Sequence, residues 1–143
     1  TSLMRTAFTT LAISSAIALT TLATSVQADG DPTSVFNSHI QGFTTGDLEM
    51  VQSNLTEETV LIIPGATYTG VAEFSEYITG QMQEFGQEGV VFEMGEMHVS
   101  GKIVYISWSA ETPENSYIYA TETYLIEDGK IAVQTVGWIK EPK

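Results

Sequence analysis

The hydrophobic repeat of this chain changes once, near Gly86, and that change limits the possible folds more than any other feature. Before Gly86, apolar residues recur every three or four positions, as on one face of a helix, whereas after it they alternate, as on a half-buried strand. Helices followed by an unbroken run of strands predict an α+β domain, with helices on one face of a curved antiparallel sheet. A parallel sheet or two separate cores would contradict this architecture.

The part before the change is predicted to contain three helices and one strand. The helices are expected at 32–45, 47–53 and 70–85. Asp31 supplies a side-chain cap for the first helix, Pro32 suits its first position and Gly46 ends it. The apolar run 59–63 is predicted to be a buried strand of the same sheet, ended by Pro64.

The part after the change is predicted to be a meander of four strands. They are expected at 90–99, 103–110, 116–126 and 131–139. Gly101 marks the first hairpin turn, and the pair Asp128-Gly129 is a strong signal for a type I′ turn between the last two strands.

Residues 1–28 resemble an export signal preceded by a short artificial extension before Met4. Arg5 is followed by an apolar stretch, and Val26-Gln27-Ala28 places small residues where a signal peptidase cuts. The sequence therefore predicts a mature domain 29–143 that is periplasmic or secreted. A retained membrane anchor is the alternative, but eight Ser and Thr residues between positions 9 and 25 disfavour it. Since the chain has no cysteine, lipid anchors, disulfides and thiolate chemistry are excluded.

The predicted mature domain is strongly acidic. It has four lysines, no arginine and 18 acidic residues, for a formal charge of −14. Such a surface repels phosphate backbones and anionic lipid headgroups. We therefore expect no nucleic-acid partner and no stable attachment to a membrane.

The order of these elements resembles the nuclear-transport-factor-2-like superfamily, which includes SnoaL-like polyketide cyclases and ketosteroid isomerases. The residues that carry the resemblance span the mature chain and are Gly46-Asp47-Leu48-Glu49, Val60-Leu61-Ile62-Ile63-Pro64, Tyr68-Thr69-Gly70 and Ile126-Glu127-Asp128-Gly129-Lys130-Ile131. The resemblance implies a cone-shaped domain whose curved sheet wraps around helices and encloses a pocket. It also implies that the protein forms dimers, as many members do.

The resemblance does not carry ketosteroid isomerase chemistry over to this chain. The position of the proton-shuttling aspartate of those enzymes falls at Ile63, that of the oxyanion tyrosine near His39, and that of the second oxyanion acid at about Thr121. Two carboxyl groups are thus expected to be replaced by side chains that cannot do the same work.

His39 is the first candidate for chemistry. It lies on the apolar stripe of the first helix, between Phe36 and Phe43, so we expect it to point into the cone. Histidine titrates near pH 6.5 and is the usual general base at neutral pH. The alternative is a buried neutral histidine bonded to a backbone carbonyl or to water.

Strand alternation, anchored on the resemblance, divides the meander into two faces. The residues expected to face inward are Val104, Ile106, Trp108, Tyr117, Tyr119, Thr121, Thr123, Gln134, Val136 and Trp138. The candidates for ligand contact are Phe43, Ile63, Phe74, Trp108, Thr121, Gln134 and Trp138, and Tyr119 is a tentative catalytic partner of His39. The aromatic candidates can equally be core residues without a binding role.

The opposite face is expected to be apolar as well. It would present Ile103, Tyr105, Ile118, Ala120, Tyr124 and Val133. A convex sheet face this apolar is predicted to be covered by a second copy in a symmetric homodimer.

The sequence contains no motif for a cofactor or a metal. There is no phosphate-binding glycine loop and no nucleophile elbow, and the two histidines, His39 and His98, lie on unrelated elements. We therefore predict neither a metal nor a cofactor.

Two functions remain open at this point. One is an exported domain that binds a small apolar molecule, or a protein partner, without catalysis. The other is an acid–base isomerase, dehydratase or cyclase in which His39 is the base and Tyr119, Thr121 or Gln134 polarises a carbonyl. They differ in one structural requirement, because a catalytic His39 must face a cavity.

Overall fold

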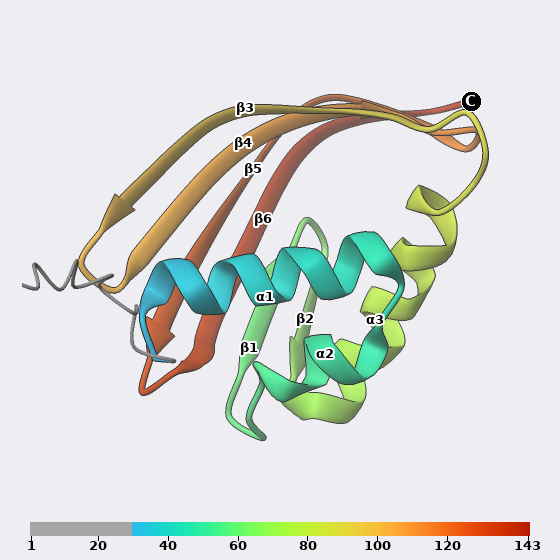
Figure 1. The fold of residues 1–143 in the computed structure, drawn as a ribbon. Coiled ribbons are helices and arrows are strands. Elements are labelled where there is room, and N and C mark those ends of the chain that lie inside the picture. The colour runs from blue at the N-terminus through green and yellow to red at the C-terminus, as the bar shows by residue number, and fades with distance from the viewer. Residues whose placement is uncertain (1–29) are drawn as a thin grey trace, which may run out of the picture.

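The computed structural model describes residues 30–143, and Figure 1 shows the chain as a ribbon. The predicted signal segment 1–28 and the membrane-anchor alternative therefore lie outside the described residues. Within 30–143, no helix is both long and apolar enough to cross a bilayer.

The three helices form where the sequence predicts them, and side-chain caps begin the first two. They are α1 (Pro32–Thr45), α2 (Leu48–Ser53) and α3 (Gly70–Phe85). The Asp31 carboxylate accepts a hydrogen bond from the Ser34 N–H at 3.3 Å, and the Asp47 carboxylate accepts one from the Met50 N–H at 3.0 Å. Asp47 is thus the cap of α2 rather than its first residue. Gly46 ends α1 with a φ of 69°, a conformation that favours glycine.

The six strands form one sheet in the order β2-β1-β6-β5-β4-β3. They are β1 (Val60–Ile63), β2 (Ala66–Thr69), β3 (Val91–Ser100), β4 (Ile103–Glu111), β5 (Asn115–Glu127) and β6 (Lys130–Pro142). The four meander strands are confirmed, and so is the type I′ turn, since Asp128 and Gly129 have φ values of 51° and 73°.

Two features of the sheet differ from the prediction. Pro64 and Gly65 do not simply end β1 but form a two-residue turn, in which Gly65 has a φ of 84°, and the chain returns as β2. In addition, β1 pairs in parallel with β6, with Leu61 opposite Gln134, so the sheet is antiparallel except for this pair. The parallel pair places the apolar β1–β2 hairpin at the free edge of β6, next to the helices (Figure 1).

The sheet bends around α1, which lies across its concave side (Figure 1). Bulges accompany this bend in β3, between Met94 and Met97, and in the β4–β5 ladder. At the first bulge Gly95 leaves no room for a side chain, because an added Cβ would lie 2.5 Å from the Ser107 hydroxyl oxygen. That hydroxyl instead accepts a hydrogen bond from the Glu96 N–H at 2.9 Å.

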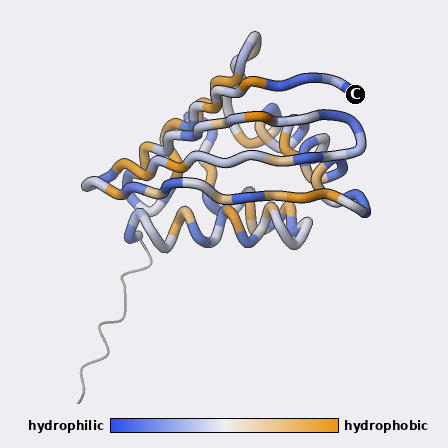
Figure 2. The backbone as a smooth tube through the Cα atoms, turned by 90° about the horizontal axis from the view of Figure 1, so that it is seen from above, coloured by the Kyte–Doolittle hydropathy of each residue, from blue (hydrophilic) through white to orange (hydrophobic). Residues whose placement is uncertain are grey.

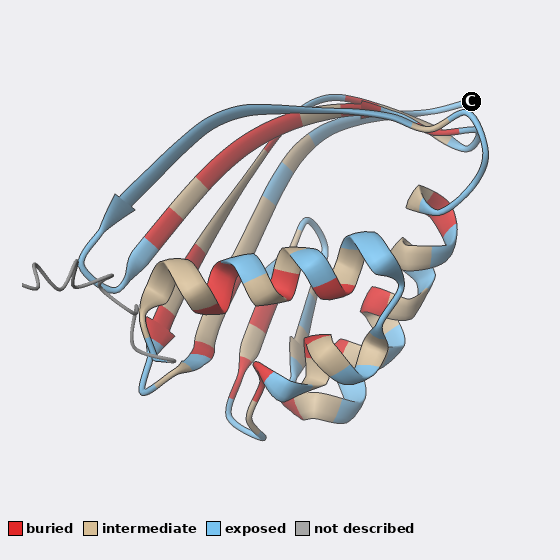
Figure 3. Cartoon of the chain, viewed as in Figure 1, coloured by how far each residue is buried: buried red, intermediate tan, exposed pale blue. Residues whose placement is uncertain are grey.

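The hydrophobic core lies between the helices and the concave side of the sheet. Hydrophilic and hydrophobic positions alternate along the strands (Figure 2), and buried residues gather on the sides of the helices and strands that face one another (Figure 3). Leu61 of β1, Phe74 of α3 and Val51 of α2 are completely buried in this core. The α+β fold with a curved sheet around N-terminal helices is thus confirmed.

The bulge in β5 reverses part of the predicted alternation. The pairing of β5 with β6 shifts between Tyr117 and Tyr119, so one extra residue enters β5 there. Beyond this point every side chain changes faces relative to the simple alternation. Ala120 and Tyr124, expected on the outer face, are completely buried, whereas Tyr119 is 49% exposed.

The cross-strand partners show the same reversal. Ala120 pairs with both Trp108 and Trp138, and Tyr124 pairs with Gln134, so all of them share the concave face. The predictions that Tyr119, Thr121 and Thr123 face inward and that Ala120 and Tyr124 face outward are therefore wrong. Elsewhere the predicted inward set holds, since Val104, Ile106, Trp108 and Tyr117 are buried and Gln134, Val136 and Trp138 face the cavity described below.

Candidate functional site

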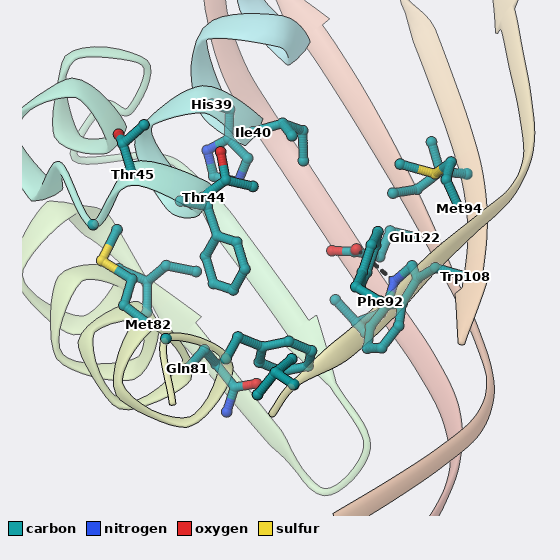
Figure 4. Close-up of a pocket in the computed structure, with 18 of the residues that line it drawn as sticks. His39, Ile40, Thr44, Thr45, Gln81, Met82, Phe92, Met94, Trp108 and Glu122 are labelled. Atoms are coloured by element: carbon teal, nitrogen blue, oxygen red, sulfur yellow. Dashed lines mark hydrogen bonds between the residues drawn. The ribbon is translucent and has the colours of Figure 1, made fainter. Parts of the chain in front are cut away.

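A cavity of about 640 Å³ lies between the two longer helices and the concave face of the meander (Figure 4). Its walls come from α1, from the C-terminal half of α3, from the loop after α3 and from strands β3 to β6. The walls are mostly apolar, and their largest side chains are Phe43, Phe85, Phe92, Trp108, Tyr124 and Trp138. This volume is within the range of about 300–1,000 Å³ that is usual for small-molecule sites.

Glu122 places a carboxyl group on the sheet wall of this cavity (Figure 4). Three neighbouring side chains hold the carboxyl by donating hydrogen bonds to it. The Trp108 indole N–H donates to Oε2 at 2.8 Å, and the Gln134 amide and the Tyr124 hydroxyl donate to Oε1 at 2.8 and 3.1 Å. The donors come from three adjacent strands, so the sheet fixes the position of the carboxyl group.

The protein environment raises the pKa of Glu122 above its ordinary value. The largest cause is burial, which disfavours the charged form, and the three donated hydrogen bonds lower the pKa in opposition. The same surroundings raise the pKa of Tyr124 well above its ordinary value, first through burial and then through the nearby Glu122 charge. Glu122 is therefore a carboxyl group prepared to exchange a proton closer to neutral pH than an exposed one.

Two polar atoms at this end of the cavity have no hydrogen-bond partner among residues 30–143. They are Oε1 of Gln134 and Nδ1 of His39, both on side chains that are almost completely buried. Gln134 uses its amide nitrogen on Glu122 and on the Tyr124 hydroxyl, at 3.2 Å, which leaves its oxygen as a free acceptor. Buried polar atoms usually have a partner, so atoms without one at a cavity indicate where a ligand or a water would bind.

His39 faces the cavity from α1, as the sequence predicts (Figure 4). Its ring packs edge-on against Phe74 and Tyr124, with centroids 5.9 and 5.6 Å away. Burial lowers the pKa of His39 to about 4, so the imidazole is neutral at neutral pH. The predicted geometry is confirmed, with Trp108 and Trp138 among the walls, whereas the catalytic role stays a prediction.

The other predicted contact residues divide into two groups. Phe43, Trp108, Gln134 and Trp138 line the cavity. Phe74 and Ile63 do not: Phe74 is a fully buried core residue and Ile63 packs against the core. These two belong to the scaffold, since Phe74 packs edge-on against the His39 ring within the core and Ile63 packs against that core.

Thr121 and Tyr119 lie away from the cavity, on the outer face of the sheet. Thr121 lies between its cross-strand partners Ser107 and Gly137, and Tyr119 lies beside Tyr105. The β5 bulge is the reason, as shown above. It removes Tyr119 from the catalytic candidates and Thr121 from the ligand contacts.

Glu122 is the functional candidate that the sequence analysis missed. The resemblance to ketosteroid isomerases placed their second oxyanion acid at about Thr121, and the next residue is the carboxyl in the cavity. The expectation that both carboxyl positions are replaced is thus wrong for this one. A signal was available, because Glu122 alternates with Ala120, Tyr124 and Ile126, the more apolar half of the strand.

The described residues give no sign of a metal centre, since within 30–143 no three His, Asp or Glu side chains come together as ligands. The polar end of the cavity consists instead of Glu122, Gln134 and His39, with the aromatic rings around them.

Residues 36–134, most of the domain described above, match the family model of the SnoaL-like domain. The chain belongs to this family. No curated protein sequence matches it. The fold is also that of solved nuclear-transport-factor-2-like structures, so both the family and the fold that the sequence resembles are shown.

Three of these solved structures illustrate the likeness. An NTF2-like protein of unknown function from Cytophaga hutchinsonii is 15% identical, with a TM-score of 0.62 over 76% of this chain and 90% of that one. A putative polyketide cyclase from Sinorhizobium meliloti is 18% identical, with a TM-score of 0.60 over 71% and 92%. An LEH-like epoxide hydrolase from M. tuberculosis is 13% identical, with a TM-score of 0.59 over 76% and 82%. At these identities the likeness concerns the fold of the SnoaL-like domain and not its activity.

Proposed function

We propose that this SnoaL-like domain binds a small, largely apolar molecule in its cavity and directs a polar group of that molecule toward Glu122. The observation that carries the proposal is the combination of about 640 Å³ of aromatic-lined space with a carboxyl group held on its wall. A packed core normally leaves few voids larger than a water molecule, so a space of this size is a feature that the fold maintains. The apolar walls would supply most of the affinity, and the polar end would orient the molecule.

A second candidate is acid–base catalysis by the same site, as an isomerase, dehydratase or cyclase. The raised pKa of Glu122 favours it, because a general acid or base works best when its pKa lies near the working pH. His39 would then serve as a hydrogen-bonding neutral imidazole rather than as the principal base, since its pKa is about 4. Structural neighbours described as a putative polyketide cyclase and an LEH-like epoxide hydrolase show that this fold also occurs in proteins to which such reactions are attributed.

The binding proposal predicts that a neutral apolar probe enters the cavity. N-phenyl-1-naphthylamine should change the fluorescence of the protein's two tryptophans, Trp108 and Trp138, because both line the cavity. Val136→Phe places a larger side chain in the same space and should weaken probe binding by about tenfold or more.

The matched control for this experiment is Ile139→Phe on the same strand. Ile139 is 58% exposed and does not line the cavity, so the added ring should leave probe binding unchanged. Equal binding by both variants and the unmodified chain would mean that the probe binds elsewhere, and the proposal would fail.

We also propose that the domain is exported after cleavage near Ala28 and forms a homodimer through the outer face of its sheet. The exposed apolar residues on this face include Ile103, Ile118 and Tyr119. The outer face is therefore apolar even though the β5 bulge turns Ala120 and Tyr124 inward. A symmetric partner would remove these side chains from water.

Light scattering at micromolar concentration is expected to give twice the mass of one chain. Ile118→Lys introduces a charge on the outer face, where Ile118 is 52% exposed, and should halve the measured mass without changing probe binding. A monomeric unmodified protein would rule out this dimer and leave the cavity proposal intact.

A further inference from the structure

The polar end of the cavity contains several hydrogen-bond acceptors. Glu122 contributes a carboxyl group, Gln134 contributes an unpartnered amide oxygen, and His39 contributes a neutral imidazole with its Nδ1 unpartnered. Trp108, Tyr124 and the Gln134 amide nitrogen already donate to Glu122 or to Tyr124. The other side-chain donors at this end are the Tyr77 hydroxyl and the single N–H of the neutral His39 ring. The Glu122 carboxylate and the unpartnered Gln134 oxygen therefore favour a ligand that supplies hydrogen-bond donors.

The charges of the cavity also favour a ligand that is not an anion. Glu122 is the one acidic side chain among the described residues that line it, and none of these residues is a lysine or an arginine. The Lys140 ammonium group lies 4.7 Å from the Trp138 ring centroid, but Lys140 does not line the cavity. An anionic group would thus enter without a counter-charge and would face a carboxyl, which is unfavourable at low dielectric.

The aromatic walls of the cavity also favour a cation. Trp108, Trp138 and Phe85 present aromatic rings to the cavity, and aromatic faces attract organic cations. The Lys140 ammonium over the Trp138 ring shows one such contact within this protein. Aromatic walls around one carboxyl group are the arrangement that suits an ammonium ion with apolar substituents.

We propose that the cavity selects an organic amine in its protonated form, with the ammonium group bound between Glu122 and the Gln134 amide oxygen and the apolar body against the aromatic walls. This inference rests on the proposed function, because it names the class of ligand for the same cavity.

Three probes that share one apolar body test the inference directly. They are 4-phenylbutylamine, 4-phenyl-1-butanol and 4-phenylbutanoate, which differ in a head group that is cationic, neutral or anionic. Tryptophan fluorescence reports binding, since both tryptophans line the cavity. We expect the amine to bind at least about tenfold more tightly than the alcohol, because a hydrogen-bonded charge pair is stronger than a neutral hydrogen bond, and the carboxylate to bind most weakly.

The dependence of affinity on pH gives a second readout that needs no variant. An ammonium group favours ionised Glu122, whose pKa is raised by burial, so affinity for the amine should rise as increasing pH ionises Glu122, and we expect this rise between pH 5 and pH 8. The other titratable groups that face Glu122 are Tyr124 on the same strand, Tyr77 on α3 and His39 on α1. None of them changes charge in this interval, because both tyrosine pKa values are raised and that of His39 is about 4.

Glu122→Gln removes the charge and nearly keeps the size of the side chain. It should reduce the preference for the amine over the alcohol by about tenfold. Glu93→Gln is the matched control: Glu93 is exposed on β3 and does not line the cavity, so this variant changes the overall charge equally and should keep the preference. If Glu122→Gln fails to fold, the pH profile of the unmodified protein still decides.

The outcomes separate this inference from the proposed function. If the alcohol or the carboxylate binds as tightly as the amine, or if amine affinity falls with rising pH, the inference is overturned while the binding function stands. If none of the three probes changes the tryptophan fluorescence and the naphthylamine also fails to do so, both are overturned.

Discussion

We expect Phe74→Ala to lower the free energy of unfolding by about 3–5 kcal/mol, the usual cost of removing a fully buried aromatic side chain. Phe74 has no exposed surface, belongs to the main core and packs edge-on against the His39 ring. Its removal would leave a void between α3 and the sheet that the surrounding backbone cannot close. The loss is a large share of the stability of a domain of this size, which is about 5–15 kcal/mol.

Denaturant unfolding followed by circular dichroism measures this loss. Phe43→Ala is the matched control, since Phe43 is only half-buried and already borders the cavity. Truncating it enlarges an existing space, so we expect a cost of only about 1–2 kcal/mol. If the two variants lost equal stability, Phe74 would not be the core residue that the structure makes it.

The helices and the last hairpin could be predicted because their signals are local. Asp31 and Gly46 define the ends of α1 through their own hydrogen bonds and dihedral angles, and Asp128-Gly129 defines its turn in the same way. The strand β2 could not be predicted, because the pair Pro64-Gly65 is compatible both with the end of a strand and with a tight turn into a second strand. Only the pairing of residues 66–69 with β1 shows that the pair forms a turn.

Part of the candidate site could be predicted, because some of its residues also follow from local patterns in the sequence. His39 and the tryptophans follow from periodicity, because α1 keeps its helical repeat and the strand residues around Trp108 and Trp138 alternate regularly, from Val104 to Trp108 in β4 and from Gln134 to Trp138 in β6. In β5, one residue inserted between Tyr117 and Tyr119 exchanged Thr121 for Glu122 on the cavity wall. A bulge depends on how two strands pair, so a count along a single strand cannot show it.

The pH dependence of stability is the second large effect that we expect, and His39 is its source. Its pKa is lowered from 6.5 to about 4 in the folded protein, because burial disfavours the charged ring. Above pH 6.5 the imidazole is neutral in both states, so the protein keeps its full stability. As pH falls below 6.5 the unfolded chain takes up a proton that the folded protein does not, and stability is lost progressively until about pH 4. Between pH 7 and pH 5 this linkage amounts to about 2 kcal/mol.

His39→Gln should remove this contribution, whereas His98→Gln should keep it, because the His98 side chain is 68% exposed on β3. The measurement is the difference in unfolding free energy between pH 7 and pH 5 for the three proteins. The contribution of Glu122 to the pH dependence of stability has the opposite sign, since its raised pKa makes the folded state gain stability as pH falls. All three proteins contain Glu122, so this contribution cancels when they are compared. Should His39→Gln lose as much stability on acidification as the unmodified chain, the imidazole would have to be solvated and able to accept a proton in the folded state. The inference that a neutral His39 ring lies at the polar end of the cavity would then be wrong.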